Sequence, residues 1–356
     1  MANLIDYVKW RGDLNFKDSP FNEIDNAVLS FLAYVNFDHI SQRKGKLGDV
    51  CNRLLAHHEG EEEKIVGGLI VPKTILDLFK ISKDTVRFGN IKFSDFVNHI
   101  SIEERCQFSA CTFHLSSKEM VVVFRGTDDT TIGWQENLDM IIKSPIMGEI
   151  KAKEYLERIA QKFPNKKIWV CGHSKGGHLS TYASIYASDA VKKRIIQAYS
   201  NDGPGFLDGT IDSVLFEKIK DKITLIIPND SIVGLLFNEM AGKVKIVIAS
   251  KRGPFQHDMY TWEVEGTKFC EVSDVMNSAK KTDKEITELV DSLNLEERVS
   301  VASDIYTFIT ESKIFTLQEG SRDLSTVLKY LGKIKYKNKK LFFKFFRIIL
   351  TNHPMI

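Results

Sequence analysis

The segment Gly172-His173-Ser174-Lys175-Gly176 combines residue types and a spacing that suit nucleophilic catalysis by serine. It follows the apolar, β-forming run Ile168–Cys171, and it precedes a segment with the hydrophobic spacing of a helix. A Gly-x-Ser-x-Gly segment between a strand and a helix places the serine on a sharp turn. Backbone N–H groups at the start of the helix then stabilise an oxyanion. We therefore predict that Ser174 is a nucleophile in acyl transfer. The alternative is a glycine-rich strand–helix turn with an incidental serine.

A serine hydroxyl needs a positioned base, which is usually a histidine. Where this kind of turn carries a catalytic serine, the acid and then the histidine follow it along the chain. Downstream of Ser174 the sequence contains His178, His257 and His353. His178 lies one turn into the predicted helix and His353 lies in a basic tail. His257 lies in a turn between two strand-like runs, so we predict that it is the base.

Two aspartates are candidates for the acid that orients His257. Asp230 closely follows the predicted strand Ile223–Ile227, and Asp202 follows the predicted strand Ile195–Tyr199. Catalytic groups of parallel sheets gather at the carboxyl ends of strands, which both positions satisfy. Asp202 lies in a turn rich in glycine and proline, where an aspartate commonly bonds to its own local backbone. We therefore favour Asp230 and keep Asp202 as the alternative.

The oxyanion hole requires two N–H donors. One is the residue after the nucleophile, Lys175. For the second we predict Thr127, which ends the loop Phe124-Arg125-Gly126-Thr127 after an earlier strand. Asp128 and Asp129 follow this loop, but without a histidine or a spaced third carboxylate they do not favour a metal site. The mechanism implies no cofactor.

These residues need a sheet to hold them. Strand-like runs alternate with helical patterns along the chain, which predicts an α/β fold with a mainly parallel central sheet flanked by helices. Residues 1–280 form the predicted catalytic domain, with a largely helical extension over 1–105, including Phe93–Glu104, and a core over 106–280. Phe108–His114 and Met120–Phe124 read as a hairpin. From Glu285 onward three or four helices are expected, one of them at 321–331, and residues 281–356 form a C-terminal helical region.

The 356 residues are 43% hydrophobic and 27% charged, which is typical of a globular protein, and the net charge of +2 does not suggest nucleic-acid binding. The charge is nevertheless uneven, because residues 324–356 hold eight Lys or Arg and no Asp or Glu. Leu341–Leu350 mixes bulky apolar residues with cations. As a helix it would either lie on an anionic membrane surface or pack on the core with its lysine ammonium groups in water.

The five cysteines show no pairing pattern, and the first residues lack the basic and apolar regions of a signal peptide. No run of 18 apolar residues occurs. We therefore expect a reducing, cytoplasmic location.

The loop ending at Thr127, Trp134, the Gly172–Gly177 segment, Asp230 and His257 together resemble the class 3 (fungal-type) lipase group of α/β-hydrolases. Three stretches, Ile5–Leu14, the Gly-His-Ser-Lys-Gly-Gly segment and His257–Trp262, more closely resemble the DUF2974 family within that group, over about residues 1–265. The resemblance implies an α/β-hydrolase fold. It also implies catalytic roles for Ser174, Asp230 and His257, oxyanion donors at Thr127 and Lys175, and a lid in the segment after Thr127. Asn137 lies near a position where the lipase pattern often has an acid.

Together these observations predict a serine hydrolase that cleaves a carboxylic ester of a small acyl or lipid substrate. The alternative is a non-catalytic scaffold of the same fold that binds a lipid, a membrane surface or a protein partner.

Overall fold

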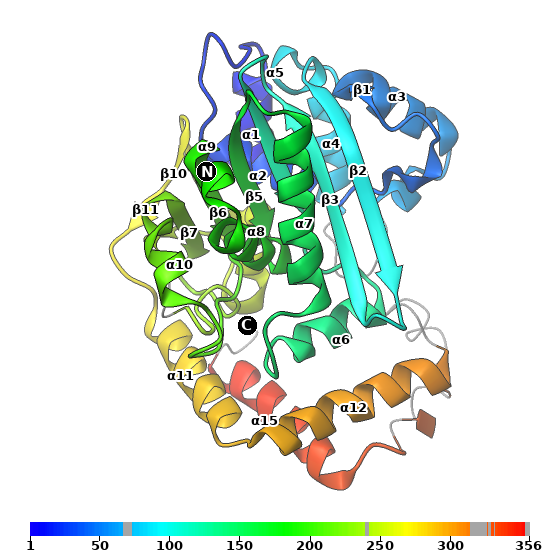
Figure 1. The fold of residues 1–356 in the computed structure, drawn as a ribbon, viewed down its shortest axis with the longest axis vertical. Helices are drawn as coiled ribbons and strands as arrows, with labels where there is room; N and C mark the ends of the chain where they lie inside the picture. The colour runs from blue at the N-terminus through cyan, green and yellow to red at the C-terminus, as the bar shows by residue number, and fades with distance from the viewer. Residues whose placement is uncertain (67–72, 239–241, 314–325, 327–328, 331, 353–356) are drawn as a thin grey trace.

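The computed structural model describes residues 1–66, 73–238, 242–313, 326, 329–330 and 332–352. Its framework is a nine-stranded sheet in the order β1-β2-β3-β4-β5-β6-β7-β8-β11 (Figure 1). The strands of this sheet are β1 (Gly45–Lys46), β2 (Lys92–Ser101), β3 (Cys106–His114), β4 (Glu119–Phe124), β5 (Lys167–His173), β6 (Ile195–Asn201), β7 (Ile223–Pro228), β8 (Lys243–Val247) and β11 (Glu271–Val272). A separate two-stranded sheet joins β9 (Val264–Glu265) to β10 (Lys268–Phe269).

The centre of the large sheet is parallel from β4 to β8, and the strands on either side of it are antiparallel. This arrangement confirms the predicted α/β fold with a largely parallel core, and the predicted hairpin corresponds to β3 and β4. The helices that follow strands of the parallel core are α6 (Thr131–Asp139), α7 (Met147–Lys162), α8 (Lys175–Tyr186), α9 (Asp189–Arg194) and α10 (Ser213–Glu217). Because β4 to β8 are parallel, their carboxyl ends lie at one edge of the sheet, where the candidate catalytic residues are expected.

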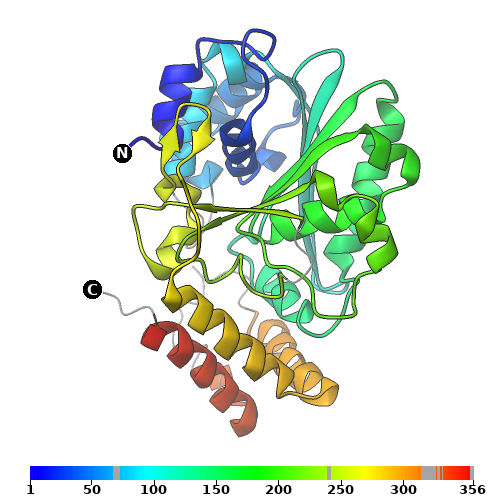
Figure 2. The same ribbon diagram turned by 90° about the vertical axis from the view of Figure 1, so that its left-hand side faces the viewer.

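Side chains of β4 alternate between two separate apolar layers, as the two-residue period of a strand requires. Val121 and Val123 pack into one buried cluster, while Met120, Val122 and Phe124 pack into another with α7 and α8. The first cluster is closed by the N-terminal helices, which lie on the opposite face of the sheet from α7 and α8 (Figure 2). These helices are α1 (Leu4–Arg11), α2 (Glu23–Leu32), α3 (Leu47–His57), α4 (Thr74–Ser82) and α5 (Val86–Gly89). The N-terminal part is therefore a structural layer of the sheet rather than an appendage.

The helix predicted at Phe93–Glu104 is wrong, since this segment forms most of β2. The pairing of β2 with β3 shifts register between Ser94 and Val97, and Asp95 there has a φ of 57°. At a β-bulge the strand contains one extra residue, which interrupts the two-residue alternation of its side chains. The apolar residues of this segment therefore recur with a spacing that resembles that of a helix. Phe93 packs toward the N-terminal layer and Val97 toward the layer of α7.

The C-terminal region contains α11 (Asn277–Asp291), α12 (Leu295–Ser312) and α15 (Tyr336–Asn352), which lie beyond the carboxyl edge of the sheet (Figure 1). Of the predicted helix at 321–331, most residues lie outside the described part of the chain. Ile348 of α15 is buried in a small apolar cluster with Ile286 and Leu289 of α11 and with Ile232, which follows β7. The tail helix is thus packed on the rest of the protein. In the described ranges, no helix has the length and apolar character needed to cross a bilayer.

Candidate active site

Ser174 occupies a strained turn between β5 and α8, with φ of 57° and ψ of −131°. This region of backbone space is unfavourable for residues with a β-carbon and persists only where the surroundings enforce it. Close packing enforces it here, because a β-carbon on Gly172 would lie 2.1 Å from the Gly176 oxygen. A β-carbon on Gly176 would lie 2.1 Å from the Phe124 oxygen. The predicted turn is therefore present, and Ser174 is the N-cap of α8, a helix of 12 residues.

His257 is paired with Asp202, and its Nδ1 lies 2.7 Å from Asp202 Oδ2. The Asp202 carboxylate is almost fully buried, while the His257 side chain is 29% exposed. The other carboxylate oxygen, Oδ1, accepts hydrogen bonds from Ser231 Oγ at 2.5 Å and from the Gly234 amide at 3.0 Å. Because a carboxylate oxygen only accepts, Nδ1 of His257 is the donor in this contact, and Nε2 does not contact the carboxylate. This is the orientation that a general base for serine requires.

The prediction that Asp230 orients His257 is wrong. Asp230 Oδ2 accepts the Gly253 amide at 2.8 Å, and its Oδ1 accepts Ser278 Oγ at 2.5 Å. Asp230 therefore ties the end of β7 to the turn η4 (Gly253–His257) and to the start of α11. The same turn is also held by Gln256, whose side-chain oxygen accepts the Asp230 amide at 2.7 Å. Asp230 fixes the loop that carries the histidine, and Asp202 contacts the histidine itself.

His173 connects the serine turn to His257, which the sequence analysis did not foresee. Its Nε2 lies 2.7 Å from the His257 carbonyl oxygen, and its Nδ1 lies 3.0 Å from the Tyr34 hydroxyl. Since a carbonyl only accepts, Nε2 carries the proton and Nδ1 accepts from Tyr34. Burial drives the pKa of His173 well below its usual value, so this imidazole stays neutral. His173, the residue before the nucleophile, thus fixes the main chain of His257. The centres of the two imidazole rings lie 4.6 Å apart.

The loop that was predicted to complete an oxyanion hole lies against the serine turn. A β-carbon on Gly126 would lie 2.6 Å from the His173 oxygen, and one on Gly176 would lie 2.9 Å from the Gly126 nitrogen. Gly126 is therefore packed against His173 and Gly176 of the serine turn, and Thr127 follows directly. The Thr127 hydroxyl donates to Asn137 Oδ1 at 3.0 Å, so Asn137 of α6 holds this loop.

The Lys175 side chain points into the protein and forms a buried ion pair with α6. Its Nζ lies 2.7 Å from Glu136 Oε2 and also donates to the Gln107 carbonyl at 2.8 Å, and both charged side chains are at most 1% exposed. Glu136 additionally accepts the amides of Gln107 at 3.1 Å and Gly148 at 2.8 Å. The segment in which the family resemblance places a lid is therefore anchored to the serine turn. Nothing in the sequence around Lys175 identifies Glu136 as its partner.

We predict that Glu136→Gln destabilises the fold by about 3–5 kcal/mol, because it leaves the Lys175 ammonium buried without a counter-charge. Lys175→Met combined with Glu136→Gln should cost less than the sum of the two single substitutions. Equilibrium urea unfolding of the four proteins measures both quantities. The Lys175→Met variant should still react with serine-directed probes, since only its backbone N–H is assigned to the oxyanion.

A matched control is the partly exposed pair of Lys151 and Glu104, whose atoms lie 3.0 Å apart. Glu104→Gln should change the free energy of unfolding far less than Glu136→Gln does, because water screens the exposed pair. Equal costs for Glu136→Gln and Glu104→Gln would contradict the structural role given to the buried pair.

The remaining predicted or possible sites do not join this constellation. His178 is buried with its Nε2 2.8 Å from Glu149 Oε1, and His353 lies outside the described residues. His99, Glu104 and Cys106 bring three possible metal ligands within 4.8 Å of one another. However, burial raises the pKa of the Cys106 thiol to about 12, and Glu104 is already paired with Lys151. Both facts disfavour cation binding there.

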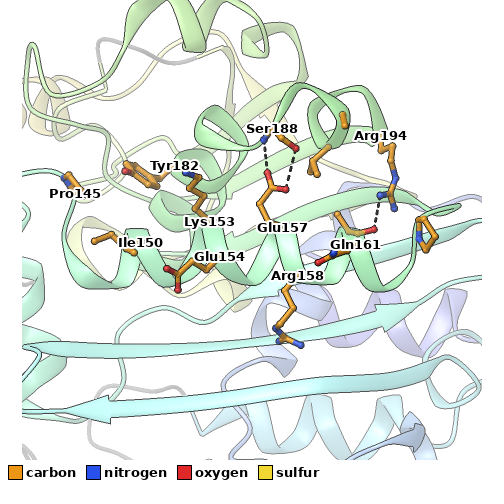
Figure 3. A pocket seen from close by; sticks show the side chains of 14 residues that line it. Pro145, Ile150, Lys153, Glu154, Glu157, Arg158, Gln161, Tyr182, Ser188 and Arg194 are labelled. Carbon is orange, nitrogen blue, oxygen red and sulfur yellow. Dashed lines mark hydrogen bonds between the residues drawn. The ribbon is translucent and has the colours of Figure 1, made fainter.

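A groove of about 950 Å³ lies between α7, α8 and α9 (Figure 3). Lys153, Glu157, Arg158, Tyr182 and Arg194 are among its lining residues. Neither Ser174, Asp202 nor His257 borders it. The groove is therefore separate from the candidate active site.

Residues 82–307, more than half of the chain, match the family model described as Mbeg1-like, which confirms the family resemblance drawn from the sequence. No curated protein sequence matches the chain.

Several solved lipases overlap the structure in part. A fungal lipase in complex with an inhibitor is 13% identical, with 57% of this chain and 81% of that chain covered and a TM-score of 0.36. A lipase from Yarrowia lipolytica is 14% identical, with 49% of this chain and 70% of that chain covered and a TM-score of 0.34. A mutant form of MDLA from Penicillium cyclopium is 12% identical, with 69% of this chain and 83% of that chain covered and a TM-score of 0.38.

Proposed function

Because this chain belongs to the Mbeg1-like family and holds His257 against Asp202 beside the strained Ser174 turn, we propose that it is a serine hydrolase that cleaves carboxylic esters. The observation that carries the proposal is the hydrogen bond of 2.7 Å between His257 Nδ1 and Asp202 Oδ2. A buried carboxylate on Nδ1 prepares Nε2 to accept the proton of a serine hydroxyl, which a structural histidine does not need.

In the proposed mechanism, Ser174 Oγ attacks the ester carbonyl carbon while His257 Nε2 takes the serine proton. Asp202 stabilises the imidazolium that forms. The carbonyl oxygen becomes an oxyanion and accepts hydrogen bonds from the backbone N–H groups of Lys175 and Thr127. Each hydrogen bond stabilises the transition state by about 3 kcal/mol. His257 then gives its proton to the leaving alcohol, and an acyl-enzyme ester on Ser174 remains. Water, deprotonated by His257, cleaves that ester and restores the serine.

For the substrate we propose a small acyl or lipid ester, and for the location the cytoplasm. The location is supported by the five cysteines, each of which is free and four of which are buried. Free thiols in this number are typical of reducing compartments.

The proposal is tested with p-nitrophenyl esters of increasing acyl length, followed by monoacyl lipids, and with a fluorophosphonate probe. We expect saturable turnover by the wild-type protein and its complete loss once about one probe molecule is bound per chain. Folded protein that neither hydrolyses any ester nor reacts with the probe would contradict the proposal and favour the non-catalytic scaffold.

A further inference from the structure

The outer face of α15 carries aromatic and cationic side chains in alternation. Tyr336, Lys340, Phe343 and Arg347 follow one another at spacings of four, three and four residues, which places them on one stripe of a helix. All four are exposed, Tyr336 by 73% and Phe343 by 74%. Large aromatic side chains at this level of exposure are uncommon on a helix that is otherwise packed on the protein.

The opposite face of α15 fixes the orientation of this stripe. Ile348 is buried against α11, and Leu341 packs on the same cluster. Asn338 is also buried, and its side-chain nitrogen donates to Asp304 of α12 at 2.8 Å. The helix is therefore seated through one face, and the stripe from Tyr336 to Arg347 points away from α11 and α12.

The cations of this region fall into two groups. On the side of α12, Lys337 pairs with Glu297 and Lys333 pairs with Glu311, so protein carboxylates neutralise those charges. By contrast, Lys340, Lys344 and Arg347 form no ion pair with any residue in the described ranges. Lys340 instead lies over the Tyr336 ring, with Nζ 4.7 Å from its centre. Because residues 324–356 contain no Asp or Glu, this face has a net positive charge.

We propose that the stripe Tyr336–Lys340–Phe343–Arg347 docks the protein on the surface of a bilayer that contains anionic lipid. Lys340, Lys344 and Arg347 would contact headgroup phosphates, and Phe343 would enter the boundary between headgroups and acyl chains. α15 lies beyond the carboxyl edge of the sheet, at the end of the molecule that holds the candidate active site (Figure 1). The inference stands on the surface of α15 alone and does not depend on ester hydrolysis.

The test is flotation of the full-length protein with vesicles of phosphatidylcholine alone or with 30% phosphatidylserine, at low and at high salt. We expect binding only to the anionic vesicles, with strong weakening at high salt because the charges are solvent-exposed. Lys340→Gln with Arg347→Gln should lower the partition coefficient about 30-fold, since each cation at an anionic surface contributes about a factor of five. Phe343→Ser should lower it about tenfold through lost apolar burial.

A matched control is Lys118→Gln with Lys193→Gln, which removes two exposed cations at the β3–β4 turn and on α9. Far-UV circular dichroism checks that every variant is folded. The proposal is overturned by equal binding to both vesicle types, by unchanged binding of both α15 variants, or by an equal loss in the control. Heparin or single-stranded DNA bound as tightly as the vesicles, with the same dependence on Lys340 and Arg347, would assign the stripe to polyanions and would also overturn it.

Discussion

Replacement of Ser174 by alanine is expected to abolish labelling by a fluorophosphonate and to lower ester turnover by about 10⁶-fold, to the level of the remaining scaffold. The alanine variant keeps the β-carbon and the backbone N–H groups of the turn, so substrate binding should be little changed. The two measurements are in-gel labelling and the initial rate with a p-nitrophenyl ester. His257→Ala should reduce both to a comparable degree, because nucleophile and base act as one unit.

Substitution of Ser174 by glycine separates catalysis from stability. With φ of 57° and ψ of −131°, residue 174 occupies a conformation that suits only glycine. Ser174→Gly should therefore be as inactive as the alanine variant. It should nevertheless be more stable than the alanine variant by about 1 kcal/mol, because the strain that glycine relieves exceeds the extra conformational entropy that glycine loses on folding. Thermal unfolding of the two variants measures this difference. An active Ser174→Ala protein would refute the proposed nucleophile, and a glycine variant less stable than the alanine variant would refute the strain.

Local patterns in the sequence predicted the serine turn because all of its determinants lie within a few residues. The strand before Ser174, the small residues around it and the helix after it are adjacent in the chain. The determinants of β2, by contrast, are not all adjacent in the chain. Its alternation is interrupted at Asp95, whose carboxylate is held by Ser94 at 2.7 Å and by Lys162 at 2.5 Å. Lys162 belongs to α7, so the interaction that stabilises the bulge is distant in sequence.

The choice between Asp202 and Asp230 failed for a related reason. Both follow a strand of the parallel core, so position at the carboxyl edge does not separate them. The expectation that Asp202 bonds to its own turn is wrong, because its carboxylate contacts Ser231, Gly234 and His257. A β-carbon on Gly234 would lie 2.2 Å from Asp202 Oδ1, so a glycine far along the chain makes room for this carboxylate. Only the folded arrangement of three loops identifies the partner of His257.

Asp202→Asn is expected to lower kcat by about 10⁴-fold with little change in fold. The orientation of the new amide follows from the structure, since Ser231 Oγ and the Gly234 amide both donate to Oδ1 and would keep an oxygen there. The amide nitrogen would then face His257 and donate to Nδ1. The histidine proton would move to Nε2, which could no longer accept the proton of Ser174.

Asp230→Asn is the matched comparison, because it makes the same chemical change in an aspartate at the end of the neighbouring strand. Its amide oxygen can still accept the Gly253 amide, and the Ser278 hydroxyl can rotate to accept from the amide nitrogen. We therefore expect kcat within about tenfold of the wild type and a loss of stability of about 1–3 kcal/mol, since a charged hydrogen-bond acceptor is replaced by a neutral one. Steady-state kinetics and urea unfolding of both variants measure these effects. A larger loss of kcat in Asp230→Asn than in Asp202→Asn would reverse the assignment of the acid.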